Sequence, residues 1–303
     1  MPQTVIGVSI LLAGILAGTL TTTLTTTLTA AGAPAQASDF RRLVVFGDSL
    51  SDTGNTASAP YSNGPVWVER IADRLGVEVA PSERGGSNYA VGGARIVGPS
   101  GSFSLLDQAA RFLAEEPDTA RPDTLFIVYG GGNDLFAILD SGIGSGASAA
   151  EAGHAADMAA DALAGIVRDL VEAGARTILV PNLPDLAHVP AVRQLGPSAP
   201  SAASLLTRRF NDRLARGLDR VDAAAGPGTA ILRLDVHGLL ERALADPAAV
   251  GMDGIDISTP CLDPNGHCAD PDRHLFWDSI HPTSLGHDRL GEAALRELRV
   301  LPS

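Results

Sequence analysis

Basic residues are scarce in this sequence. Its 303 residues include 22 Lys and Arg against 35 Asp and Glu, which gives a formal net charge of −13 at pH 7. Nucleic acids are bound through phosphates that Lys and Arg neutralise, so we expect no nucleic-acid partner. The same charge opposes electrostatic docking on anionic membranes, and any transient contact with a lipid surface is expected to be apolar. The simplest role of the charge is to keep the protein soluble.

Ionisable side chains are missing from the start of the chain. Residues 1–37 contain no Asp, Glu, Lys or Arg, are apolar from Val5 to Leu20, continue through a Thr-rich run and end in Ala-Gln-Ala. This pattern predicts a signal peptide over 1–37, cleavage before Ser38 and secretion of a single domain over 38–303. Because no Lys or Arg precedes the apolar core, a misplaced start codon and an uncleaved anchor remain alternatives. The anchor is the weaker one, since the apolar run falls short of the ~20 residues that span a bilayer.

Cysteine is also rare. Cys261 and Cys268 are the two cysteines, and both lie in a segment rich in Asp, Pro and Gly. In an exported chain such a pair is expected to form a disulfide. A zinc site would need more thiol or imidazole ligands than this pair and His267 provide, and the nearby carboxylates lack EF-hand spacing. We therefore expect neither a metal nor another cofactor.

Several motifs are absent. The sequence contains no G-x-S-x-G, which excludes the nucleophile elbow of α/β-hydrolases, and no H-E-x-x-H, which excludes zincins. No repeat recurs at a fixed period of about 20 to 50 residues, which argues against solenoids and propellers.

The sequence does contain apolar strand candidates that alternate with helices. Hydrophobic residues make up 45% of the chain, enough for a sizeable core. Right-handed crossovers between such strands give a three-layer α/β/α sandwich with a mainly parallel, five-stranded sheet. The strands are expected at 43–46, 87–91, 124–129, 176–180 and 230–235. Helices are expected at 65–76, 155–173, 201–223 and 284–298, a flexible linker at 141–150, and a long loop at 247–275.

Polar or glycine residues follow three of these strands. Ser49 comes after the first strand, Gly93 after the second and Asn133 after the third. The carboxyl ends of parallel strands open onto the crevice where ligands bind. Each motif by itself is equally typical of a turn. Far along the chain, Asp278 precedes His281 by three residues, which completes a Ser, His and Asp set.

Four sequence blocks occur in the order found in the GDSL esterase/lipase family, also called SGNH hydrolases, which this chain resembles. The residues in these blocks most resemble those of secreted bacterial lipase and phospholipase-like members. The blocks are Gly47-Asp48-Ser49-Leu50, Asn88 to Ala94, Gly131-Gly132-Asn133-Asp134 and Asp278-Ser279-Ile280-His281.

The resemblance implies a role for each matching residue. Ser49 would be the nucleophile, His281 the general base and acid, and Asp278 the group that orients the imidazole. The oxyanion hole would be formed by the backbone N–H groups of Ser49 and Gly93 and by the Asn133 side chain. Gly92 remains an alternative to Gly93.

The function that follows is a monomeric secreted serine esterase or lipase that cleaves carboxylic esters, including lipid or phospholipid acyl esters. Removal of acetyl groups from carbohydrate is an alternative, weakened by an aromatic content of only 4%. Acyl transfer to an acceptor other than water is a second. A non-catalytic exported binding protein is a third, although it would have no need of Ser49, Asn133, Asp278 and His281.

Overall fold

The computed structural model describes residues 40–56, 61–99, 101–116, 122–145 and 148–298. The predicted signal peptide over 1–37 and its cleavage point before Ser38 lie outside these residues. Among the described residues, no helix is both long enough and apolar enough to cross a membrane.

The main sheet is parallel and has the strand order β1-β2-β3-β4. Its strands are β1 (Arg42–Gly47), β2 (Thr124–Tyr129), β3 (Thr177–Pro181) and β4 (Ala230–Leu234). β2 is buried at every position, as expected for a central strand covered on both faces. Because all four strands run the same way, their carboxyl ends meet at one edge of the sheet.

The fifth predicted strand, 87–91, is not a regular strand. It runs beside β1, where Val45 N–H donates to Ser87 O at 3.1 Å and Tyr89 N–H donates to Val45 O at 2.8 Å. The pairing reduces to one isolated bridge, between Val45 and Asn88. On the outer edge of the segment, Asn88 N–H donates to Ala80 O, which belongs to a loop. Among the described residues, the expected five-stranded sheet is therefore corrected to a main sheet of four strands, with 87–91 as an irregular edge segment.

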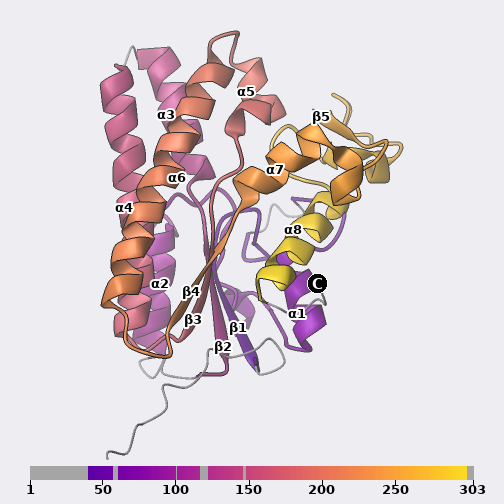
Figure 1. Ribbon diagram of the computed structural model, residues 1–303. Coiled ribbons are helices and arrows are strands. Elements are labelled where there is room, and N and C mark those ends of the chain that lie inside the picture. The colour runs from indigo at the N-terminus through magenta and orange to yellow at the C-terminus, as the bar shows by residue number, and fades with distance from the viewer. Residues whose placement is uncertain (1–39, 57–60, 100, 117–121, 146–147, 299–303) are drawn as a thin grey trace, which may run out of the picture. The chain divides into compact units, whose positions relative to one another are not determined.

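Helices cover both faces of the sheet, which confirms the three-layer α/β/α prediction (Figure 1). One layer contains α2 (Leu105–Glu115), α3 (Gly132–Ser145), α4 (Ala149–Glu172) and α6 (Ala199–Ala224), with α4 packed along α6. The other contains α1 (Trp67–Leu75) packed against α8 (Ser284–Glu297). Two shorter helices follow the carboxyl ends of β3 and β4, namely α5 (Pro190–Gln194) and α7 (Val236–Ala245).

Two of the predicted irregular segments contain regular structure. The linker expected at 141–150 is partly helical, because α3 continues to Ser145 and α4 begins at Ala149. Ser148 caps α4 in a reciprocal capping box with Glu151, a signal that the low-complexity composition obscured. The loop expected at 247–275 contains β5 (Asp256–Pro260) and the start of β6 (His274–Phe276), which pair in parallel. Between these strands, Cys261 and Cys268 form a disulfide with a Cα–Cα distance of 5.0 Å.

Candidate active site

Ser49 lies in the turn that follows β1. The carbonyl oxygen of Asp48 accepts hydrogen bonds from the backbone N–H groups of Ser51 and Asp52, with N···O distances of 3.0 Å. These two bonds close the turn. Ser49 is buried, with 7% of its surface exposed. The turn therefore holds the Ser49 side chain at the carboxyl edge of the sheet, sheltered from bulk water.

His281 and Asp278 lie in the short turn between β6 and α8. Asp278 Oδ2 is 2.7 Å from His281 Nδ1. Asp278 Oδ1 accepts hydrogen bonds from the backbone N–H of Ile280 at 2.8 Å and from that of His281 at 2.7 Å. Burial alone would raise the pKa of Asp278, but the hydrogen bonds from His281 and Ile280 outweigh it and hold the pKa below its usual value. Asp278 is therefore a carboxylate that accepts a hydrogen bond from Nδ1–H.

The structure brings Ser49 and His281 together across 232 positions of sequence. His281 Nε2 is 2.8 Å from Ser49 Oγ. With the Nδ1 proton directed at Asp278, the neutral imidazole presents Nε2 as an acceptor for the Ser49 hydroxyl proton. Ser49, His281 and Asp278 thus form a continuous hydrogen-bonded relay whose geometry suits activation of a serine.

The backbone around Gly92 and Gly93 separates the two oxyanion candidates. Gly92 N–H donates to Asp52 Oδ2 and Thr56 Oγ1, both at 2.9 Å, so it is already committed. Gly93 has φ +77°, in the left-handed region that glycine tolerates. Among the described residues, neither the backbone N–H of Gly93 nor that of Ser49 donates a hydrogen bond. These two N–H groups are therefore available to a ligand, and Gly92 is not.

Asn133 lies at the start of α3, directly beyond the end of β2. Its Nδ2 donates one hydrogen bond to Ala94 O at 2.9 Å. This bond ties Asn133 to the loop that contains Gly92 and Gly93, which we call the glycine loop. A side-chain amide carries two N–H donors, so one remains. Asn133 lines the same cavity as Ser49. The structure thus brings Ser49 and Asn133 to one cavity and ties Gly93's loop to it.

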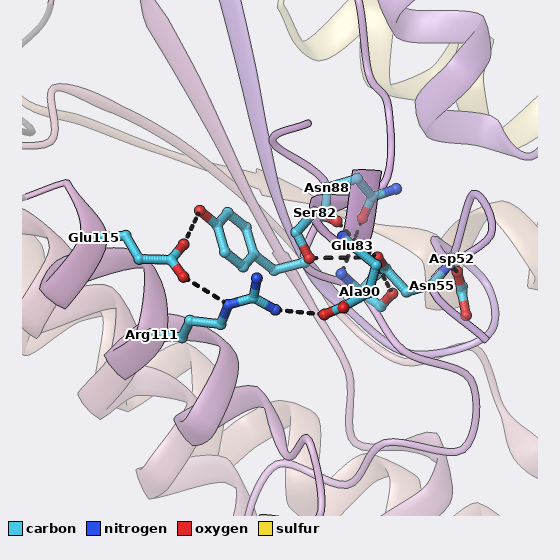
Figure 2. A network of polar contacts seen from close by, with 9 residues as sticks. Asp52, Asn55, Ser82, Glu83, Asn88, Ala90, Arg111 and Glu115 are labelled. Atoms are coloured by element: carbon cyan, nitrogen blue, oxygen red, sulfur yellow. Dashed lines mark hydrogen bonds and ion pairs between the residues drawn. The ribbon is translucent and has the colours of Figure 1, made fainter. Parts of the chain in front are cut away.

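A polar network fixes the Ser49 loop against the edge segment (Figure 2). Asn55 Nδ2 donates to Asn88 O and Ala90 O, both at 2.8 Å, and Asp52 receives the Gly92 N–H. Farther out, Arg111 bridges Glu83 and Glu115. The nucleophile turn and the glycine loop are therefore joined by direct hydrogen bonds.

Two further carboxyl groups near the site are buried. Burial raises the pKa of Asp48 to about 6, although the Leu50 N–H and the positive charge of His281 act against it. Burial likewise raises the pKa of Asp134 to about 6, against a hydrogen bond from the Ile96 N–H. Both carboxyls hold backbone groups in place, at 3.0 Å for Leu50 and 2.9 Å for Ile96. Neither is hydrogen-bonded to His281.

A cavity of about 140 Å³ opens beside Ser49. Its walls are mostly aliphatic and come from the segments 183–189, 236–243 and 275–290. The first two segments follow β3 and β4, so that part of the cavity lies at the carboxyl edge of the main sheet, as the parallel topology predicts. The third segment runs from β6 into α8. Ser49 therefore faces a largely apolar space.

The GDSL-like lipase/acylhydrolase family model matches residues 43–294. The chain belongs to this family. It is 31% identical to a protein of the trpE-trpG intergenic region of Pseudomonas putida and 30% identical to esterase EstA of Pseudomonas aeruginosa, each over 88% of this chain. It is 27% identical to a phosphatidylcholine-sterol acyltransferase of Aeromonas hydrophila over 86% of this chain and 91% of that one. The chain spans about half the length of the two Pseudomonas relatives, 51% and 49%.

Two supporting residues of this GDSL-like chain were not identified from the sequence. Gln108 exchanges hydrogen bonds of 2.9 Å with both backbone groups of Gly47, just before the nucleophile turn. Trp67, fully buried in α1, donates from Nε1 to Ser51 Oγ at 3.0 Å. Neither residue belongs to a motif, and a helical apolar pattern was their only signal.

One group of described side chains has the composition of a metal site. Donor atoms of Asp185, His237 and Glu241 lie within 4.8 Å of one another. The oxygens of Asp185 already accept hydrogen bonds from Ala187 N–H and Ser204 Oγ. The group includes none of Ser49, His281 and Asp278.

Proposed function

We propose that this chain is a serine hydrolase of carboxylic esters and that it acts through a covalent acyl-enzyme. The observation that carries the proposal is the relay of 2.8 Å and 2.7 Å that links Ser49 to His281 and His281 to Asp278, with Ser49 at the wall of an apolar cavity. Membership of the GDSL-like lipase/acylhydrolase family supports the same reaction.

The reaction has two halves. In the first, Ser49 Oγ attacks the ester carbonyl carbon while its proton passes to His281 Nε2, and Asp278 stabilises the imidazolium that forms. The oxyanion accepts hydrogen bonds from the N–H groups of Ser49 and Gly93 and from Asn133. His281 then protonates the leaving alcohol. In the second half, water attacks the acyl carbon by the same route and Ser49 is released.

The proposed substrates carry an apolar acyl group. The aliphatic cavity walls favour a hydrocarbon chain and offer few groups for a sugar, which weakens the carbohydrate deacetylase alternative. An engineered apolar cavity of roughly 150 Å³ admits benzene, so a cavity of about 140 Å³ suits a short acyl chain more directly than a long one. Phospholipid acyl esters remain within the proposal if part of the chain extends beyond the cavity.

Acyl transfer is the second candidate function. One relative is named phosphatidylcholine-sterol acyltransferase, and the chain covers 91% of its length. The same acyl-enzyme can be attacked by an alcohol in place of water, so the two reactions share every residue named above. Adding a long-chain alcohol to the assay and measuring the ester formed distinguishes transfer from hydrolysis.

The test is hydrolysis of p-nitrophenyl esters from acetate to palmitate by residues 38–303, beside Ser49→Ala and Asn133→Ala. We expect Ser49→Ala to abolish turnover and Asn133→Ala to lower kcat by roughly 10²- to 10³-fold, the usual effect of losing one oxyanion donor. Leu205→Ala, an exposed position on α6, is the control and should leave kcat unchanged. Full activity in Ser49→Ala, or failure of a fluorophosphonate to label Ser49, contradicts the proposal.

We also propose export and cleavage before Ser38, on the sequence pattern of residues 1–37. Expression of the full chain in a bacterial host, followed by N-terminal sequencing of the extracellular protein, tests this directly. A first residue of Ser38 supports it, and a chain that remains in the cells with its N-terminus intact contradicts it.

A further inference from the structure

The Tyr61 ring packs against the His281 imidazole in a tilted arrangement. The centroids of the two rings are 5.0 Å apart and their planes are inclined by 41°. The two hydrogen bonds of His281 hold Nδ1 and Nε2 on opposite sides of the ring, and the ring is also tethered through Cβ. Packing against the ring further limits how far its plane can tilt. Tyr61 supplies such a contact.

The other end of Tyr61 touches the glycine loop. A Cβ added to Gly92 would lie 1.8 Å from the Tyr61 hydroxyl oxygen and 2.3 Å from its Cζ, far inside contact distance. Gly92 is not among the glycines with positive φ, so its backbone conformation is open to alanine. Steric contact with Tyr61, and not backbone strain, is therefore what requires glycine at position 92.

The Tyr61 hydroxyl makes no hydrogen bond to any other described residue. The contacts of Tyr61 with His281 and with Gly92 are therefore van der Waals contacts. Tyr61 thus touches both His281, the proposed base, and the loop that carries the Gly93 N–H.

We propose that Tyr61 is a positioning residue that sets the ring plane of His281 and the distance between that ring and the Gly92–Gly93 loop. This inference rests on the proposed function, because it assigns Tyr61 a part in orienting the same serine relay. Tyr61 acts through its ring, and its hydroxyl is dispensable. Gly92 is small because Tyr61 occupies the space where its side chain would be.

The experiment compares Tyr61→Phe, Tyr61→Leu and Tyr61→Ala on p-nitrophenyl acetate, with kcat expressed per site titrated by a fluorophosphonate. We expect Tyr61→Phe to stay within about twofold of the wild type. Tyr61→Leu and Tyr61→Ala should lower kcat by about tenfold to a hundredfold with little change in KM, since a misplacement near 1 Å costs on the order of 10²-fold in rate. If Tyr61→Ala melts earlier but keeps full kcat per titrated site, its role is structural and the inference is overturned.

A double-mutant cycle tests the Gly92 contact separately. Gly92→Ala alone should lower both Tm and kcat, because the new Cβ displaces Tyr61. In Gly92→Ala with Tyr61→Ala the clash is gone, so the combined loss should be smaller than the product of the single losses. Losses that multiply without coupling overturn the inference.

Failure of the proposed function gives a different result. If the wild type labels at Ser49 and turns over while the Tyr61 variants match it, only the positioning role is wrong. If the wild type neither labels nor turns over any ester, both the function and the inference that rests on it are wrong.

Discussion

Two carboxyl groups near His281 have pKa values shifted in opposite directions. Hydrogen bonds from His281 and Ile280 overcome burial at Asp278 and lower its pKa, whereas burial dominates at Asp48 and raises its pKa to about 6. Such a division is typical of catalytic sites, where the surroundings of each titratable group set its role. Asp278 therefore loses its proton more readily than an ordinary aspartate, and Asp48 less readily.

The raised pKa of Asp48 predicts a pH-dependent cost to stability. The unfolded chain ionises this carboxyl near its ordinary pKa of 3.8 and the folded chain near 6, so the folded state binds more protons in between. Stability contributed by Asp48 is therefore lost as pH rises through this window, by up to about 3 kcal/mol. Asp48→Asn should gain that much relative to the wild type between pH 4 and pH 7.

Urea unfolding of both proteins at pH 4, 5, 6 and 7 measures this difference. Asp134, whose pKa is raised in the same direction, is present in both proteins, and its repulsion of Asp48 is part of the shift that the comparison measures. A gap between Asp48→Asn and the wild type that stays constant over the range would show that Asp48 is not desolvated as the structure indicates.

At the scale of the element, the glycine loop after the edge segment decides where an oxyanion can bind. The loop is held by Asp52 through Gly92 and by Asn133 through Ala94. Its left-handed residue, Gly93, then turns its own N–H out of these interactions. The direction of one donor is thus set by the conformation of a short loop.

Gly93→Ala tests this with Gly76→Ala as a matched control. Both glycines have positive φ, +77° and +68°, and neither has a heavy atom near the place of a new Cβ. Both variants should lose about 1 to 2 kcal/mol of stability from left-handed backbone strain. Only Gly93→Ala should lower kcat, by at least about tenfold, because its N–H is displaced from the oxyanion. Thermal melts and ester kinetics read the two effects separately, and equal kcat losses in the two variants would rule out a special role for Gly93.

At the scale of the whole molecule, the cavity exists because distant segments converge at one edge of the sheet. Its walls follow β3 and β4 and continue along the segment from β6 to α8, while Ser49 follows β1 and Asn133 follows β2. Acyl-chain preference therefore depends on residues that belong to none of the four sequence blocks. Leu240 on α7 is one of them.

Leu240→Trp should shorten the preferred acyl chain. The larger ring fills apolar space in the cavity. The turnover of the acetate ester should therefore change by less than about threefold, while the turnover of longer esters should fall by about tenfold or more. A hydrophobic pocket typically discriminates between substrates by about 1–3 kcal/mol per methylene. Leu205→Trp, at an exposed position on α6, is the control. The p-nitrophenyl ester series reports the optimum. A loss that is uniform over all chain lengths would mean that Leu240 does not bound the acyl site.

The sequence by itself determined the features that depend on local chemistry. The apolar runs of β1 to β4 predicted a parallel sheet because buried strands need uninterrupted apolar residues, and Gly76 marked the end of α1 because it adopts the left-handed cap. Ser49 and Asn133 were identified because polar residues at strand ends gather at the ligand-binding edge. Asp278 and His281 were identified from a spacing of three residues.

Tertiary structure decided what depends on groups far apart in sequence. The 2.8 Å contact between Ser49 and His281 spans 232 positions, and no local pattern reports such a distance. The choice of Gly93 over Gly92 depended on Asp52, which captures one N–H and leaves the other. The edge segment 87–91 failed to become a full strand because a loop takes its outer hydrogen bonds. Tyr61 carries no motif, and its contacts appear only when the fold brings it between His281 and Gly92.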